Sequence, residues 1–546
     1  MCWGYDRRFD GATGGYKGVD LSKRRESRHR RVTARMMAGV SIVLFLFGCA
    51  IQESQGPATY DAARASRVFS AGYQDVADIY IEDLRVSDLA YSGLYGLSSI
   101  DPTIEIDRGE NELTLTVDGR EAGRFPSPPV DNLDSWGDLT ATAIEAVRTS
   151  SDALSEAESE EVYAAVFSGL VEELDDFSRY AGREQARENR ASRDGFGGVG
   201  VRIRVVDEGV KILSVMENTP AESAGLMDND LITQINGEPA AGLSQREVVQ
   251  RLRGPIRTRV TVVVQRAEEP TPLNISVTRA HIVPQTVKYR AEGNVAYIKI
   301  AGFNQNTAQT VREKLLQADR ELGNDLQGFV LDLRDNPGGL LDQSVSVSDL
   351  FIPRGRIVST HGRHPDSHQF FDADQDDLTH GLPIVVLVNG NSASASEIVA
   401  AALQDSGRAV LIGSNSFGKG TVQTVLRLPN EGELTLTWAR FHAPSGYTLQ
   451  ERGVLPDICT NDEVGSAAEL LGKVRRGEAV ISRKTRTRSI SPHDEAGLAE
   501  LRARCPVSEE ENKLDLQVAL ALLEDTSLFA QLLRGGVPET AERPAN

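Results

Sequence analysis

The hydrophobic and polar positions between residues 292 and 458 switch repeatedly between two periodicities. Apolar runs such as NVAYIKI, GFVLDLRD, PIVVLVN and RAVLIGS are typical of buried strands. Between them, TAQTVREKLLQADREL and SASASEIVAAALQD have the spacing of amphipathic helices. Strands that alternate with helices predict an α/β core in this part of the chain.

Residues 50–190 have a different pattern. The stretch 103–125 (TIEIDRGENELTLTVDGREAGRF) alternates with period two and predicts short strands, whereas 160–180 has the spacing of an amphipathic helix. We therefore expect a mixed helical and β domain here. The polar run 182–194 (GREQARENRASRD) is expected to be a charged loop.

A G-x-G-x-x-G pattern follows at Gly195, Gly197 and Gly200. A dinucleotide site needs a strand before this pattern and a helix after it, so that the pyrophosphate meets a helix N-terminus. Here a strand-like alternation follows, in GVGVRIRVV. The pattern therefore does not predict nucleotide binding.

The segment that follows is similar to a PDZ domain over about residues 190–280, and we place this domain at 191–280. The resemblance rests on VKILSV, the helix PAESAGL, DLITQINGEP and the helix SQREVVQRL. It implies that Gly198, Val199, Gly200 and Val201 form a carboxylate-binding loop, in which successive N–H groups hold an anion while a peptide adds beside the next strand. A glycine bulge at the start of a strand is the structural alternative.

Length and composition narrow the class of protein. The 546 residues favour three or four domains, and 40% hydrophobic with 25% charged residues is a globular balance. The net charge of −20 argues against nucleic acid as a partner. Four cysteines, without metal-ligand spacing, exclude a disulfide framework, but one bridge between Cys459 and Cys505 remains open if the protein is exported.

The start of the chain is typical of an export signal. A basic stretch precedes the apolar run from Met37 to Phe47, which is too short for a permanent bilayer-spanning helix. The next residues resemble a bacterial lipoprotein processing site, which implies that Cys49 becomes the acylated first residue of the mature protein; we place the basic leader and signal peptide at residues 1–49. An ordinary signal peptide and an uncleaved anchor are the alternatives; in each case the body is exported.

The junction NGNSASASEIV places small hydroxyl residues where a buried strand turns into a helix. Unpaired N–H groups at a helix start carry partial positive charge, so a nucleophile there has stabilisation for an oxyanion. Ser394 and Glu397 also fit a capping box, in which the serine only caps the helix. The local pattern leaves both interpretations open.

The wider set of motifs resembles the carboxy-terminal processing (tail-specific) protease family. The motifs are LRDNPGGLL, VNGNSASASEIVAAALQDSGRAVLIGSNSFGKGTVQT and FHAPSGYTLQERGVLPDI, and the resemblance covers about 175–460. It implies a multidomain α/β (α+β) fold, in which a PDZ-like β-rich domain precedes an α/β serine-peptidase core at 281–460. Helical regions are expected on both sides, at 50–190 and, with a disordered tail, at 461–546.

The resemblance also implies the catalytic residues. Ser394 corresponds to the nucleophile, Lys419 to its base and Gln423 to the glutamine that orients the lysine. The oxyanion hole corresponds to the N–H groups of Gly339 and Ala395, although Gly338 is hard to distinguish from Gly339 by sequence. Supporting roles fall to Glu397 and Asp405. A lysine titrates near 10.4 in water, and burial lowers its pKa, which suits a base at neutral pH.

We therefore expect an exported serine endopeptidase, periplasmic or in the cell envelope and held to the membrane by its lipid. Its expected substrates are proteins with apolar C-terminal tails, cleaved near that end without metal or organic cofactor. An activating adaptor and a homo-oligomer stay open. The alternatives are a non-catalytic PDZ-based binding or scaffold protein at the membrane and an esterase or amidase for small molecules.

Overall fold

The computed structural model describes residues 2–4, 60–130, 132–461 and 465–535. Cys49, the predicted lipidation site, lies outside the described residues, as does the predicted tail at 536–546.

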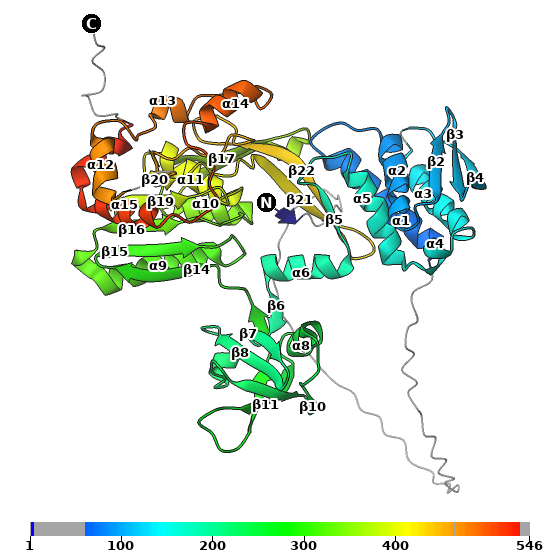
Figure 1. Ribbon diagram of the computed structural model, residues 1–546, viewed down its shortest axis with the longest axis horizontal. Helices are drawn as coiled ribbons and strands as arrows, with labels where there is room; N and C mark the ends of the chain where they lie inside the picture. Colours follow the sequence, from blue (N-terminus) through cyan, green and yellow to red (C-terminus); the bar gives the residue numbers. More distant parts are fainter. Residues whose placement is uncertain (1, 5–59, 131, 462–464, 536–546) are drawn as a thin grey trace, which may run out of the picture.

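The N-terminal region packs helices against a small antiparallel sheet of order β2-β3-β4 (Figure 1). Its elements are α1 (Ala62–Ile79), α2 (Val86–Tyr95), β2 (Ile104–Arg108), β3 (Glu112–Val117), β4 (Arg120–Pro126), α3 (Leu133–Arg148), α4 (Asp152–Glu156) and α5 (Ser159–Val171). The strands predicted over 103–125 are confirmed. Helix α5 ends earlier than predicted, because the Asp175 carboxylate accepts the N–H groups of Phe177 and Ser178 and closes a turn.

The polar run at 182–194 forms a helix, α6 (Arg183–Asp194), so the predicted charged loop is wrong. The run is rich in Glu, Gln, Ala and Arg, which favour helix, and proline and glycine are absent from its interior. Arg190 and Arg193 on α6 both pair with Glu433. The helix is therefore anchored to the protease part of the molecule.

The PDZ-like region has the strands and helices that its pattern predicts. They are β7 (Val201–Val206), β8 (Gly209–Val215), α7 (Pro220–Ser223), β9 (Leu231–Ile235), β10 (Glu238–Pro239), α8 (Gln245–Leu252), β11 (Arg259–Gln265) and β12 (Leu273–Thr278). Its sheet has the order β12-β11-β9-β8-β7, with β10 on β9. A short ribbon of β6 (Phe196–Gly198) and β13 (Ala280–Ile282) joins this region, which projects from the rest of the molecule (Figure 1).

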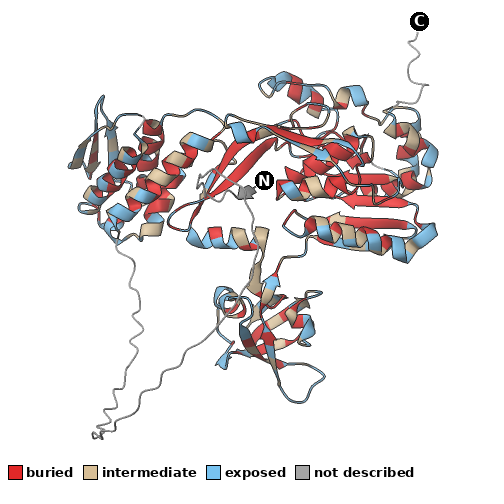
Figure 2. Cartoon of the chain, turned by 180° about the vertical axis from the view of Figure 1, so that it is seen from behind, coloured by how far each residue is buried: buried red, intermediate tan, exposed pale blue. Residues whose placement is uncertain are grey.

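The α/β core is built on a sheet of order β14-β15-β16-β19-β20-β23 that is parallel apart from β14. Its elements are β14 (Val287–Glu292), β15 (Val295–Ile300), α9 (Thr307–Leu322), β16 (Gly328–Asp332), α10 (Leu341–Asp349), β19 (Ile384–Val388), α11 (Ala395–Asp405), β20 (Val410–Gly413) and β23 (Ile458–Cys459). Every residue of β16, β19 and β20 is buried (Figure 2), as the continuous apolar runs predict. Because β16 and β19 are parallel neighbours, the turns that follow them lie at one edge of the sheet.

A second sheet has the order β1-β21-β22-β17-β18, with β5 on β22. Its strands are β1 (Cys2–Gly4), β5 (Arg179–Ala181), β17 (Gly355–His361), β18 (Gln369–Ala373), β21 (Thr421–Arg427) and β22 (Glu433–His442). The segment around His361 and His368 is thus a hairpin, although its polar composition is that of a solvent-exposed loop. The His361 ring packs against those of His368 and His442.

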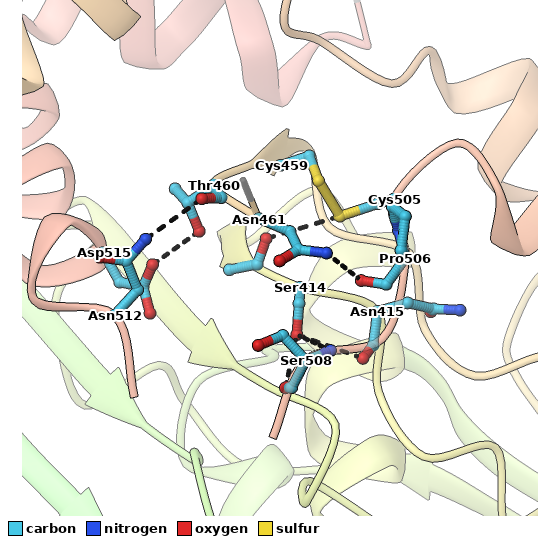
Figure 3. The surroundings of a disulfide bond; sticks show 11 residues. Ser414, Asn415, Cys459, Thr460, Asn461, Cys505, Pro506, Ser508, Asn512 and Asp515 are labelled. Atoms are coloured by element: carbon cyan, nitrogen blue, oxygen red, sulfur yellow. Dashed lines mark hydrogen bonds between the residues drawn. A yellow bond between two sulfur atoms is a disulfide. The ribbon is translucent and has the colours of Figure 1, made fainter. Parts of the chain in front are cut away.

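The C-terminal region covers the open face and edge of the core. Its helices are α12 (Ala467–Arg475), α13 (Arg483–Arg486), α14 (Glu495–Arg502), α15 (Lys513–Glu524) and α16 (Thr526–Leu533). A disulfide joins Cys459 on β23 to Cys505, whose Cα atoms are 5.8 Å apart (Figure 3). Within the described ranges, no single helix is long and apolar enough to cross a membrane. Among the described helices, only α15 and α16 taken together, with a bend of 102° between them, have the length and composition of such a helix.

Candidate active site

Ser394 lies in the turn that leads from β19 into α11. It has a positive φ of 61°, which is rare for a residue with a side chain, and it is only 1% exposed. Its Oγ has no hydrogen-bond partner in the part of the chain that the structure describes. The serine is therefore held in a constrained turn, and its hydroxyl is not used by the fold.

Glu397 connects the two halves of the predicted dyad. It is fully buried, and its Oε2 accepts both the Ser394 N–H at 2.7 Å and the Lys419 N–H at 3.0 Å. Its Oε1 accepts the Gly418 N–H and the Ser416 hydroxyl. One carboxylate therefore brings the segments of Ser394 and Lys419 together.

Burial determines the protonation of this carboxylate. It raises the pKa of Glu397 to about 7, against the opposing effect of the four hydrogen bonds it accepts, which favour the ionised form. The capping box predicted between Ser394 and Glu397 is present in the direction from the serine N–H to the glutamate. The capping interaction and an available hydroxyl therefore coexist in one residue.

Lys419 lies half-buried in a tight turn between two glycines. A Cβ on Gly420 would approach the Gln450 N–H to 2.1 Å, and Gly418 has a φ of 97°, so neither position suits a larger residue. The Lys419 Nζ lies 4.6 Å from the centre of the Phe177 ring. The amine is thus covered by an aromatic ring from a distant part of the chain.

Gln423 lies on β21, four residues after the lysine. Its amide Nε2 donates to Thr421 Oγ1 at 2.8 Å and to Thr437 Oγ1 at 3.0 Å, which fixes the side chain. Thr421 and Gln423 are on the same face of β21 because they are two residues apart. A fixed amide on the strand that follows Lys419 is suited to orient the lysine.

The NPGG turn after β16 lies against the serine. A Cβ on Gly338 would approach Ser394 Cβ and the Ala395 N to 2.9 Å. The Gly338 N–H donates to Asn336 Oδ1 and is therefore already used. Of the two glycines that the sequence cannot distinguish, Gly339 is the one whose N–H can join that of Ala395 in an oxyanion hole.

Asp405 lies away from these residues. It ends α11, whereas Ser394 precedes the first residue of that helix. At about 1.5 Å per residue, the helix separates them by about 16 Å. The Asp405 carboxylate accepts the N–H and hydroxyl of Ser445, so its contacts are with the loop after β22.

The predicted carboxylate-binding loop precedes and enters β7 of the PDZ-like region. The Val199 carbonyl accepts the Ala221 N–H, and that of Gly200 accepts the Met216 N–H. Gly200 has a φ of 90°, and a Cβ there would collide with the Thr219 side chain. Glycine is therefore required at Gly200, and the loop is far along the chain from the serine and lysine.

Several residues that complete the site were not singled out from the sequence, although Asn336 and Asn389 lie within the quoted motifs. Asn336 fixes the NPGG turn by accepting from Gly338 and by donating to the Ile300 carbonyl. Asn389 bonds Asp335 across the ends of β16 and β19. Phe177 reaches Lys419 from the N-terminal region, which no periodicity could reveal. Elsewhere in the described residues, no three His, Cys, Asp or Glu side chains are grouped to hold a metal ion.

Comparison with known proteins identifies the family of the chain. The family model described as Peptidase family S41 matches residues 294–460, and that described as PDZ domain matches 211–266. A carboxy-terminal-processing protease of Bartonella bacilliformis is 43% identical over 53% of this chain and 67% of its own length. A probable CtpA-like serine protease of Staphylococcus aureus is 34% identical over 56% of this chain and 62% of its own length.

Among solved structures, the photosystem II D1 C-terminal processing protease matches 72% of this chain and 92% of its own, with 24% identity and a TM-score of 0.37. The predicted family resemblance is confirmed by the sequence comparisons. The chain belongs to peptidase family S41, as a PDZ-containing serine protease of the carboxy-terminal-processing type.

Proposed function

We propose that the protein is an exported endopeptidase that cuts protein substrates near their C-termini with a Ser394–Lys419 dyad. The observation that carries this proposal is the buried Glu397 carboxylate, which accepts the N–H groups of both residues through one oxygen. It ties together the Ser394 and Lys419 segments, which are also joined by a backbone hydrogen bond from the Phe417 N–H to the Ser392 carbonyl. Ser394 Oγ is available as the nucleophile.

In this mechanism, the neutral amine of Lys419 takes the Ser394 proton while Oγ attacks the scissile carbonyl carbon. The N–H groups of Gly339 and Ala395 stabilise the resulting oxyanion. The tetrahedral intermediate collapses, the C–N bond breaks, and the leaving amine takes its proton from the lysine ammonium. Water then attacks the acyl-enzyme by the same route, with Lys419 again as base.

The PDZ-like region captures the substrate in this proposal. A C-terminal carboxylate would be held by N–H groups of the loop Gly198–Val201, and the apolar tail would add beside β7, an edge strand of its sheet. This region is joined to the core by the short β6–β13 ribbon. It can therefore hold a tail while the preceding residues of the substrate reach the serine.

Export and lipid attachment at Cys49 belong to the same proposal. The Cys459–Cys505 disulfide supports export, because such bonds persist in oxidising compartments such as the periplasm. The apolar run before Cys49 and its basic flank support a processed leader. An activating adaptor and a homo-oligomer are compatible with this proposal.

The test uses residues 50–546 and an unfolded protein with an apolar C-terminus, with fragments followed by mass spectrometry. Cleavage is expected for the native sequence and should be lost, by about 10⁴-fold or more, in Ser394→Ala and in Lys419→Ala. Cleavage that survives in Ser394→Ala would contradict the dyad. Turnover of small esters without protein cleavage would favour an esterase, and tail binding without turnover would favour a scaffold.

A further inference from the structure

The predicted base is covered by a residue from outside the α/β core. We propose that Phe177, in the turn between α5 and β5, is a positioning residue for Lys419, and that its ring excludes water from the amine. The inference rests on the proposed dyad and adds to it a wall supplied by the N-terminal region. In this role Phe177 acts through the lysine.

The amine of Lys419 contacts the ring of Phe177 directly. The Lys419 Nζ lies 4.6 Å from the centre of the Phe177 ring, and both residues are half-buried. The backbone of Lys419 is fixed separately, by its hydrogen bond to Glu397. The ring therefore contacts the amine end of a side chain whose other end is already held.

The position of the ring is built into the fold. The Asp175 carboxylate accepts the Phe177 and Ser178 N–H groups at 2.9 and 2.8 Å, and Ser178 Oγ accepts the Thr437 N–H at 3.2 Å. Strand β5 then pairs with β22. Thr437 also accepts the Gln423 amide. The turn that carries Phe177 is thus attached to the same sheet that carries the partner of Gln423.

A cavity of about 140 Å³ adjoins the turn that carries Phe177. Phe177 is one of its walls, with Thr421, Thr437 and Gln450 from the protease part. Its charged and titratable lining consists of Tyr80, Glu82, Asp175, Arg440, Glu451 and His493. This volume, with polar side chains among the lining residues, suffices for several water molecules. Without the ring, water would reach the amine from this side.

Two effects of the ring on the lysine oppose each other. The π-face attracts an ammonium, whereas exclusion of water disfavours the charged form. Among the residues that line this cavity, three carboxyl groups (Glu82, Asp175 and Glu451) outnumber Arg440, and with water they would stabilise an ammonium. Dehydration is therefore the dominant effect, and loss of the ring favours the protonated lysine.

The test compares Phe177→Ala, Phe177→Leu and the matched control Ser178→Ala in the full chain, solubilised in detergent. The readout is kcat/KM for a peptide substrate between pH 5 and 10. Phe177→Ala should move the acidic limb upward by at least one pH unit, with about a tenfold loss at neutral pH. Phe177→Leu keeps an apolar cover and should move it by less than half as much. Ser178→Ala keeps the ring and both hydrogen bonds to Asp175, so it should move the limb by less than Phe177→Ala does.

An unchanged limb in Phe177→Ala, a limb that moves downward, or an equal shift in Ser178→Ala would overturn the proposal. A second measurement does not depend on activity. Acetylation of Lys419 by trace acetic anhydride, followed by peptide mass spectrometry across pH, reports its titration against the exposed Lys288. A Lys419 curve that does not move in Phe177→Ala refutes the inference even if the dyad is correct. If no variant cleaves peptide, the same curve still decides the role of the ring.

Discussion

The active-site junction and the PDZ-like region differ in how far their side chains are buried. At the junction, Ser394, Ser416 and Glu397 are at most 1% exposed, and the glutamate accepts four hydrogen bonds from two segments of chain. In the PDZ-like region, apolar side chains such as Met227 and Ile256 are about half exposed. In the proposed function, catalysis takes place where buried hydrogen bonds hold the backbone, and substrate recognition takes place on a surface that stays exposed.

The attachment of the two regions differs in the same way. The strands that lead to Ser394 are buried along their whole length. The PDZ-like region is joined to the rest of the molecule by the β6–β13 ribbon and by an ion pair between Arg246 and Glu184. The side chains of Arg246 and Glu184 are both exposed. Exposed pairs contribute about 1 kcal/mol or less. We infer that the position of the PDZ-like region is easily changed, whereas the geometry of the dyad is not.

The largest expected effect comes from one methyl group at the junction. In Gly338→Ala, the new Cβ would press on Ser394 Cβ, Ala395 N and the Ala393 carbonyl, and its φ of 101° is unfavourable for alanine. We expect kcat/KM for a short peptide to fall about 100-fold or more, because the serine and the oxyanion donors are displaced together.

The matched control is Gly237→Ala in the PDZ-like region. Gly237 has a similar φ of 84°, but nothing lies within 4 Å of the new Cβ. Short-peptide hydrolysis should stay within twofold of the native rate. Equal losses in both variants would show that backbone strain anywhere, and not contact with the serine, lowers activity.

The α/β core was predictable from sequence because its strands are buried on both faces and read as continuous apolar runs. The proposed dyad was not predictable from residues alone: Ser394 fits a helix cap, Lys419 fits a surface loop, and only the family motifs connected them. The sequence could not show that Glu397 joins them, since this depends on the three-dimensional approach of two turns. Helix α6 was missed because its stability comes from helix-forming residues and pairs with Glu433, not from an apolar stripe.

A second prediction concerns the dependence of stability on pH. The contribution of a carboxyl group changes with pH in opposite directions in the two regions. Burial raises the pKa of Glu397 to about 7 from 4.5, so its contribution to stability is present below pH 4.5 and is lost as pH rises through 7. Between pH 5 and 8, the thermal midpoint of the native protein should therefore fall relative to that of Glu397→Gln. The expected size is about 1.4 kcal/mol per unit of pKa shift.

The matched variant is Glu247→Gln, in the capping box of α8. Hydrogen bonds from Ser244 lower the pKa of this exposed carboxyl, so its contribution is present above pH 4.5 and is lost only as pH falls below that value. Glu247→Gln should therefore show no difference in slope between pH 5 and 8. A slope in Glu247→Gln, or none in Glu397→Gln, would contradict the contrast between a buried and an exposed carboxyl group.

The smallest expected effect is on substrate capture and leaves the chemistry unchanged. In Gly200→Ala, the new Cβ would meet the Thr219 side chain at 2.4 Å, and the φ of 90° adds strain, so the loop at Gly198–Val201 must shift. We expect KM for a substrate with an apolar C-terminal tail to rise about tenfold, which corresponds to about 1.4 kcal/mol of tail binding. The kcat value, and the hydrolysis of a short peptide without such a tail, should not change.

Gly242→Ala has a similar φ of 81° with no atom within 4 Å, and it controls for strain alone. If Gly200→Ala lowered kcat for both substrates, recognition and chemistry would not be separable, and the PDZ-like region would act on the dyad as well as on the tail.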